Sequence, residues 1–211
     1  MVFRFFRLLP IFALLLLALC IYPAQLKLPL FAVQSSRAAV CPPEGCKTFL
    51  PAILRYIDQV SNGDFESGPV SWREYSALGY FIILRNPGEL QISPHSGSWA
   101  AWLGGADGET ASIEQSIFVS AVRPYLRYWE WIVSDEPNCS KDKAQISIDM
   151  VILVQMNLCQ ATSTLDWQVR LLDLRAYAGQ VVNLRFLVTT DTALDTQSSL
   201  YLDDISLQVA P

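Results

Sequence analysis

The sequence predicts an all-β protein built as a sandwich of two antiparallel sheets with about eight strands. Three observations lead to this prediction. Beyond Asn62, short apolar runs alternate with turn residues, and no 3.6-residue period persists for more than about two turns. Two segments also show a strict two-residue alternation of apolar and polar side chains. We therefore expect one domain over residues 62–211, a length of about 150 residues that suits a single core.

The N-terminal segment, residues 1–38, has the pattern of an export signal. Arg4 and Arg7 precede an apolar run of about 15 residues at 8–22. This run is short for a membrane span of roughly 20 residues, which favours a signal peptide. Apolar character continues over residues 26–33, so that an uncleaved membrane anchor is the alternative. We expect a secreted or cell-surface protein that contacts the membrane only through this segment.

The charge distribution argues against nucleic acid as a partner. Residues 1–38 contain four basic side chains and no acidic one, so that 11 basic side chains oppose 20 acidic ones in the remainder. An acidic surface repels phosphate backbones, and no basic cluster interleaved with aromatic residues is present in the sequence. Acidic loops can instead attract divalent cations.

Four cysteines follow the leader, and an even number in an exported chain favours disulfides. We expect Cys41 to pair with Cys46 in a small loop within a tether at residues 39–61. We expect Cys139 to pair with Cys159 around a strand that returns on itself. Metal binding by these thiols is the alternative, although the chain has no Cys-x-x-Cys motif and a single histidine.

The strands can be placed by their side-chain alternation. In residues 180–190, Val182 and Leu184 alternate with Asn183 and Arg185, which predicts one buried and one wet face. Residues 144–155 alternate in the same way and are expected to form one strand with Met150 facing the core. The other expected elements, each bounded by turn residues, are strands at 80–84, 99–103, 112–119, 125–134, 167–172 and 200–209 and one helical turn at 173–178.

Six short motifs occur in a fixed order along the domain. They are Asn-Gly-Asp-Phe-Glu at 62–66, His-Ser-Gly-Ser-Trp at 95–99, Ile-Glu-Gln-Ser-Ile at 113–117, Leu-Arg-Tyr-Trp at 126–129, Tyr-Ala-Gly-Gln at 177–180 and Leu-Asp-Asp-Ile-Ser-Leu at 202–207. Together they resemble the galactose-binding-like or MAM-like jelly-roll modules of secreted bacterial proteins, which are similar to carbohydrate-binding modules. The resemblance implies a jelly-roll sandwich.

The resemblance also implies structural calcium, with Glu66 and Asp204 as side-chain ligands and carbonyl groups near Asn62, Asp64 and Ser96 completing the shell. The residues support this independently, because carboxylates cluster at both ends of the domain and these ends meet when terminal strands pair. Calcium needs six to eight oxygen ligands. Turn capping and solvated surface carboxylates are the alternative.

Aromatic residues suggest where a ligand would bind. Trp99 and Trp102 are an odd number apart and should face opposite sides of a sheet, whereas Trp129 and Trp131 share one side. That pair is either a core stripe or an exposed surface for sugar rings. The candidate ligand-binding residues are Tyr128, Trp129, Glu130, Trp131 and Asp149, of which Tyr128, Glu130 and Asp149 would form a concave strip.

The sequence contains no catalytic constellation. It has no nucleophile elbow, no zinc-binding helix and no second histidine beside His95. Asp203 and Asp204 are adjacent on a strand and point apart, so they cannot face each other across a scissile bond. We therefore expect a non-catalytic binding or adhesion module for carbohydrate or a cell-surface glycan. The alternative is an accessory protein-interaction domain that supports a secreted enzyme or a surface assembly.

Overall fold

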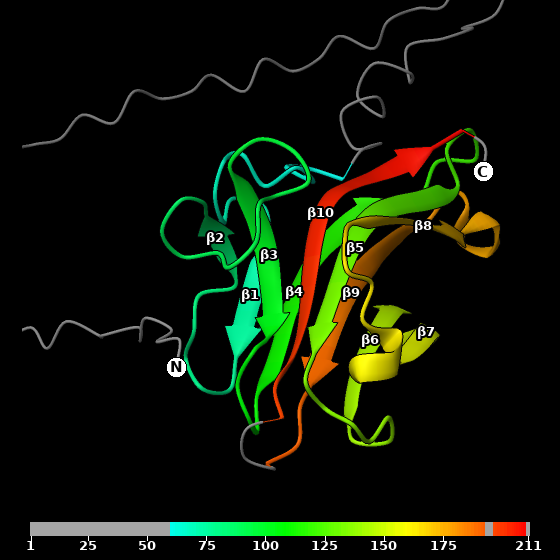
Figure 1. Cartoon of the computed structure of the whole chain (residues 1–211). Coiled ribbons are helices and arrows are strands. Elements are labelled where there is room, and N and C mark those ends of the chain that lie inside the picture. Colours follow the sequence, from blue (N-terminus) through cyan, green and yellow to red (C-terminus); the bar gives the residue numbers. More distant parts are fainter. Residues whose placement is uncertain (1–59, 193–195, 210–211) are drawn as a thin grey trace, which may run out of the picture.

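The computed structural model describes residues 60–192 and 196–209 (Figure 1). These residues form two five-stranded antiparallel sheets, which confirms the all-β sandwich. In this part of the chain no helix is long and apolar enough to cross a membrane. The expected leader at 1–38, most of the expected tether at 39–61 and the expected Cys41–Cys46 pair lie outside the described residues.

The first sheet has the order β1-β4-β9-β6-β7, and the second has the order β2-β3-β10-β5-β8. The strands of the first sheet are β1 (Arg73–Ser76), β4 (Thr110–Phe118), β9 (Val181–Thr189), β6 (Asp142–Ile148) and β7 (Val151–Leu158). Those of the second are β2 (Ile83–Arg85), β3 (Trp99–Gly104), β10 (Ser198–Gln208), β5 (Tyr125–Ser134) and β8 (Gln168–Asp173). Two short 3₁₀ helices are present, η1 (Gln160–Thr162) and η2 (Arg175–Tyr177).

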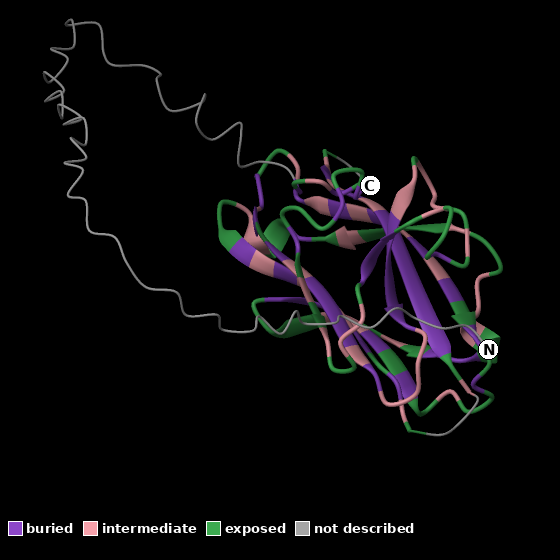
Figure 2. Cartoon of the chain, turned by 90° about the vertical axis from the view of Figure 1, so that its left-hand side faces the viewer, coloured by how far each residue is buried: buried purple, intermediate pink, exposed green. Residues whose placement is uncertain are grey.

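The core lies between the sheets and follows from the alternation of side chains. In β9, Val182, Leu184 and Phe186 are buried, as the sequence predicts. In β5, Leu126 and Ile132 are buried on the same inner face. Figure 2 shows that buried residues follow the central strands of both sheets. Removal of this apolar surface from water is the main contribution that stabilises such a sandwich.

A smaller apolar cluster covers the outer face of the second sheet. Trp102 and Tyr201 are its largest members, and Leu90 reaches it from the connection between β2 and β3. Trp99 packs instead against the main core. The prediction that Trp99 and Trp102 face opposite sides of the sheet is therefore confirmed.

One expected strand is wrong, because residues 144–155 form two strands rather than one. Ile148 of β6 pairs with Val151 of β7, so that Asp149 and Met150 form a two-residue turn in which both have positive φ values, 47° and 71°. This backbone geometry is that of a tight β-hairpin, in which Asn and Gly are the usual residues. Met150 is 91% exposed instead of buried.

The described residues form ten strands rather than about eight. The second strand of the hairpin accounts for part of the difference, and β1 accounts for the rest. The sequence of β1, Arg-Glu-Tyr-Ser, carries no apolar alternation because this edge strand is partly exposed along its whole length. The helical turn expected at 173–178 is present as η2.

A disulfide joins Cys139 to Cys159, as predicted, with a Cα–Cα distance of 5.0 Å. The two residues flank the β6–β7 hairpin and hold its open end together. Because β7 is an edge strand, this covalent link secures a strand that has a neighbour on one side only.

Candidate functional site

The first loop of the domain meets its last strand. The pairing of β10 with β5 shifts its register between Asp203 and Ser206, and Asp204 has a φ of 48° at this bulge. There the amide of Ile205 donates a hydrogen bond to the carbonyl of Gly63 over 2.9 Å. The backbones approach so closely that a Cβ atom on residue 63 would lie 1.8 Å from the Ile205 carbonyl oxygen.

Asn62 organises the loop that makes this contact. Its side-chain amide donates to the carbonyls of Gly68 and Val70, and its side-chain oxygen accepts from the amide of Ser67. Its main-chain carbonyl accepts two hydrogen bonds, from the Phe65 amide and from the Trp72 indole. Because both lone pairs of that carbonyl are used, Asp64 is the better source of a main-chain metal ligand in this loop.

Glu66 holds the loop that precedes β3. Its Oε1 accepts hydrogen bonds from the amides of Ser98 and Trp99, at 2.7 and 2.9 Å. A Cβ atom on Gly97 would lie 2.3 Å from the Glu66 carboxyl carbon, so only glycine allows this contact. The position thus explains why the sequence has Gly between Ser96 and Ser98.

The bulge of β10 presents two carboxylates to the same loop. Asp204 accepts a hydrogen bond from the Ser96 hydroxyl at 3.0 Å, and its other oxygen lies 2.5 Å from Nδ1 of His95. Asp203 is fully buried and accepts from the amides of Ser96 and Asp204. Burial raises the pKa of Asp203 to about 7 and the charge of Asp204 adds to the rise, although the amide donors oppose it.

The residues expected to bind calcium are thus gathered at one end of the sandwich. Asp204 contacts Ser96, and Glu66 contacts the adjacent Ser98 and Trp99. Asn62 and Asp64 line the same hollow as Asp204. Within the described ranges, however, no three His, Cys, Asp or Glu side chains are grouped as a metal site. A cation here would therefore need main-chain carbonyls for much of its shell.

The hollow at this end, which we call the junction hollow, has a volume of about 490 Å³. Its chemistry combines an aromatic wall with groups of both charges. The guanidinium of Arg127 lies 5.6 Å from the centroid of the Trp129 ring, and the His95 ring stacks on Trp129 with centroids 3.8 Å apart. The polar and aromatic residues that line the hollow are Asn62, Asp64, His95, Arg127, Trp129, Asp204 and Ser206.

A row of aromatic side chains continues from the hollow across the outer face of the second sheet. Trp129 and Trp131 are partly exposed and alternate with buried residues of β5, so that both point away from the core. Trp167 contacts Trp131 edge to face at 6.0 Å and His95 at 5.9 Å. We refer to Trp129, Trp131, Trp167 and His95 as the aromatic row. Neither of the two alternatives that the sequence left open holds in full, because both rings point away from the main core but are only partly exposed, and Trp131 packs against the smaller apolar cluster.

The expected concave strip of Tyr128, Glu130 and Asp149 is not formed. Tyr128 and Glu130 face the inside of the sandwich, where Tyr128 packs edge to face on Phe186. Asp149 lies in the other sheet, at the turn of the β6–β7 hairpin, and accepts a hydrogen bond from the amide of Asn183. The strip is therefore a wrong prediction, because the hairpin separates Asp149 from β5 and the alternation of β5 turns Tyr128 and Glu130 inward.

Sequence reasoning also missed four residues of this site. His95 reads as a loop residue and Asp203 as a turn cap, whereas both contact Asp204 or its loop. Arg127 lies within the Leu-Arg-Tyr-Trp motif, but neither it nor Trp167 was assigned to the site. The sequence could have indicated Arg127, because residue 127 lies on the same face of one strand as the two tryptophans at 129 and 131.

No protein-family profile and no curated protein matches the sequence. Solved structures are nevertheless similar in fold. The carbohydrate-binding module TmCBM61, solved in complex with β-1,4-galactotriose, has a TM-score of 0.51 at 13% identity and covers 72% of this chain and 97% of its own. The K3 cleaved adhesin domain of Lys-gingipain from Porphyromonas gingivalis W83 has a TM-score of 0.51 at 15% identity, with coverages of 71% and 98%. This likeness confirms the resemblance to carbohydrate-binding jelly-roll modules at the level of fold.

Proposed function

We propose that this protein is a non-catalytic, extracytoplasmic module that binds carbohydrate in the junction hollow and along the aromatic row. The observation that carries the proposal is the meeting of Trp129, Arg127 and the Asp204 carboxylate around one hollow. The fold shared with a carbohydrate-binding module supports the proposed class of ligand.

The chemistry of the hollow suits a sugar ring. The apolar C–H face of a pyranose packs on an aromatic ring, as the partly exposed Trp131 and the side of Trp129 that His95 does not cover would allow. Its hydroxyl groups both donate and accept hydrogen bonds, so that they match carboxylate acceptors at Asp64 and Asp204 and the guanidinium donors of Arg127. Adjacent donors and acceptors beside an aromatic surface favour a sugar over a purely apolar ligand.

Calcium is the second part of the proposal. The ion would be held by Asp204 and by oxygens of the 62–66 loop. Glu66 would tie that loop to Ser98, and the Ser96 hydroxyl would hold Asp204 in place. Its role would be to fix the two ends of the domain against each other and to orient the carboxylates of the hollow. The ion would do no chemistry on the sugar.

The test is binding of the purified protein to an array of plant, microbial and host glycans, followed by calorimetric titration of a bound oligosaccharide. We expect Trp129→Ala to weaken binding about tenfold or more, as the loss of a stacked aromatic ring requires. Val133→Ala is the matched control, because Val133 lies on the same outward face of β5 at its far end. The bound oligosaccharide should remain uncleaved after prolonged incubation.

Failure to bind any glycan would contradict the proposal. If the protein instead bound a defined protein partner, the accessory protein-interaction role would replace it. Equal affinity of Trp129→Ala and Val133→Ala for the oligosaccharide would show that the sugar binds elsewhere on the domain.

A further inference from the structure

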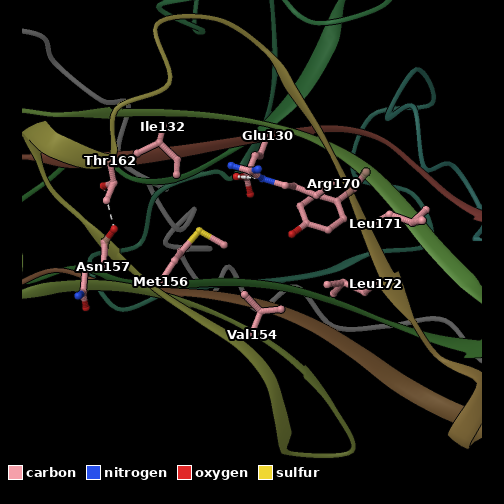
Figure 3. A pocket seen from close by; sticks show the side chains of 10 residues that line it. Glu130, Ile132, Val154, Met156, Asn157, Thr162, Arg170, Leu171 and Leu172 are labelled. Atoms are coloured by element: carbon pink, nitrogen blue, oxygen red, sulfur yellow. Dashed lines mark hydrogen bonds and ion pairs between the residues drawn. The ribbon is translucent and has the colours of Figure 1, made fainter. Parts of the chain in front are cut away.

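A second cleft opens along the side of the sandwich, between the edge strands β7 of the first sheet and β8 of the second. Its volume is about 430 Å³, within the range of small-molecule sites. It shares no lining residue with the junction hollow. Figure 3 shows Glu130 and Arg170 on one side of the cleft and Val154, Met156 and Leu172 on the other.

A buried carboxylate with an unused oxygen lies in this cleft. The side chain of Glu130 is 1% exposed, and its Oε1 accepts a hydrogen bond from Nε of Arg170 at 2.6 Å. Its Oε2 is buried and has no hydrogen-bond partner among the described residues. Since buried polar atoms are nearly always paired, this lone acceptor indicates a partner that the polypeptide does not supply.

The strand register explains why Arg170 cannot satisfy both oxygens. Glu130 of β5 is directly opposite Gln168 of β8, whereas Arg170 is opposite Tyr128. Arg170 therefore reaches Glu130 along the diagonal of the strand pair, and about half of its side chain stays exposed. This geometry leaves Oε2 of Glu130 buried and without a donor, in a side chain that lines the cleft.

The remaining walls are mainly aliphatic, although Tyr128, Asn157 and Thr162 also line the cleft with polar groups. Ile132, Val154, Met156 and Leu172 contribute side chains without hydrogen-bonding groups apart from the weak acceptor of a thioether. A sugar would leave several hydroxyl groups unpaired against these walls, which is costly. A molecule with an apolar body and a single donor would satisfy both the walls and the Glu130 oxygen.

We propose that this cleft binds a small neutral molecule with an apolar body, which donates one hydroxyl or N–H group to Oε2 of Glu130. A neutral ligand fits because the charges of Glu130 and Arg170 already balance. An ammonium group would add an unbalanced positive charge beside Arg170. The site is separate from the proposed sugar site, since Glu130 and the aromatic row lie on opposite faces of the same sheet.

The experiment titrates the purified protein with 2-naphthol and with 2-methoxynaphthalene, which retains the ring system but lacks the donor. Binding is followed by ¹H–¹⁵N chemical shifts, including that of the Arg170 Nε–H group. We expect saturable shifts in the strands that line the cleft and an affinity for 2-naphthol at least about tenfold higher, as a hydrogen bond to a charged acceptor predicts. Methyl β-D-galactoside serves as the sugar probe and should not shift these signals.

Two variants sharpen the test. In Glu130→Gln the amide oxygen would accept from Arg170 and the amide nitrogen would face the cleft, so that the preference for 2-naphthol should disappear. Val154→Trp fills the cleft from the opposite wall and should abolish binding of both probes. Ile152→Trp is its matched control, because Ile152 lies on the same strand but is half exposed.

Equal affinity for the two naphthalenes, or an unchanged preference in Glu130→Gln, would overturn the proposal. So would shifts of the cleft signals by the galactoside rather than by 2-naphthol. If Glu130→Gln does not fold, the same spectra will show it. In that case the loss of probe binding in Val154→Trp decides whether the cleft is the binding site. Glycan binding at the aromatic row is measured separately, so either proposal can fail alone.

Discussion

The amide of Ile205 donates a hydrogen bond to the carbonyl of Gly63 and so fastens the first loop of the domain to its last strand. Two features of the junction hollow follow from this contact. It places Asp64 on the same hollow as Asp204, and it sets the loop that Asn62 orders against the bulge of β10. A sugar site at this position is therefore built from the two ends of the domain.

Chelation is expected to lower the melting temperature. An ion held at about 100 times its dissociation constant stabilises the folded state by about 2.7 kcal/mol, which corresponds to several degrees for a domain of this size. EGTA should remove this stabilisation in the native protein and should have little effect on Asp204→Asn. Differential scanning calorimetry with and without added calcium measures the difference.

Asp149→Asn is the control for this prediction, because Asp149 lies at the hairpin turn in the other sheet. It should respond to EGTA as the native protein does. A melting temperature that EGTA leaves unchanged in the native protein would remove calcium from the proposed function.

Gly63→Ala should destabilise the protein by at least about 2 kcal/mol. The added methyl group would lie 1.8 Å from the Ile205 carbonyl oxygen, and the backbone fixes the position of both, so that neither can turn aside. Gly79→Ala is the comparison, since its Cβ would meet nothing within 4 Å and the cost is only the strain of a φ of +80°, about 1 kcal/mol. Urea denaturation measures the stability of both variants. Equal losses of stability would show that the loop at Gly63 can move away from β10 at little cost.

The fold could be predicted from the sequence where one face of a strand is buried. In β9 the alternation of Val182 and Leu184 with Asn183 and Arg185 is clear because one face meets the core and the other does not. The hairpin at Asp149 and Met150 was hidden, because Met150 continues the apolar phase of β6 and neither residue is typical of such a turn. Edge strand β1 was missed because little of it is buried.

The candidate site was predictable only in part. The expectation that the terminal strands pair is wrong, because β1 and β10 lie in different sheets. The loop at 62–66 reaches the β10 bulge instead, and the sequence contains the carboxylates that mark both places. The sequence does not reveal that Glu130 faces inward, because a charged residue in a strand is normally assigned to the wet face. Its burial follows from the register with β8, which supplies Arg170.

Stability in the presence of EGTA should fall as the pH rises from about 4 to about 7, in part because of Asp203. Its pKa is raised to about 7 in the folded protein, so between these pH values the folded state binds a proton that the unfolded state has lost. The contribution is complete below about pH 4 and is lost above pH 7. It is on the order of 4 kcal/mol, since the pKa rises from 3.8 to about 7 and one pKa unit corresponds to about 1.4 kcal/mol.

Asp203→Asn keeps the size of the side chain but cannot titrate, so its stability should change less across this range. Urea denaturation of both proteins at pH 4.5, 6 and 7.5 checks the prediction. If the stability of the two proteins changed equally with pH, the pKa of the buried Asp203 would not be raised in the folded state.

Removal of the disulfide should cost about 3 kcal/mol. Cys139 and Cys159 close a loop with a sequence separation of 20, for which the entropy of the unfolded chain predicts a loss of this size. The double variant Cys139→Ser/Cys159→Ser should show this decrease in urea denaturation. Reductant should lower the stability of the native protein by a similar amount, and a loss below about 1 kcal/mol would contradict the prediction.

Arg170→Met should destabilise the protein by about 3–5 kcal/mol at neutral pH, because it leaves the buried Glu130 carboxylate without its only cationic partner among the described residues. Burial already raises the pKa of Glu130, and loss of the guanidinium, which now lowers it, would raise it further. The folded variant would then hold a proton that the unfolded chain releases, so its stability should recover as the pH falls.

The double variant Glu130→Gln/Arg170→Met should regain much of the lost stability, since no charge remains buried. Arg175→Met is the matched control, because its pair with Asp173 is exposed on both sides, at 67% and 46%, and its loss should cost less than about 1 kcal/mol. Urea denaturation at pH 5 and pH 7.5 distinguishes these cases. If Arg170→Met and Arg175→Met lost similar stability at both pH values, the prediction would be wrong. Water in the cleft would then have to solvate the Glu130 carboxylate.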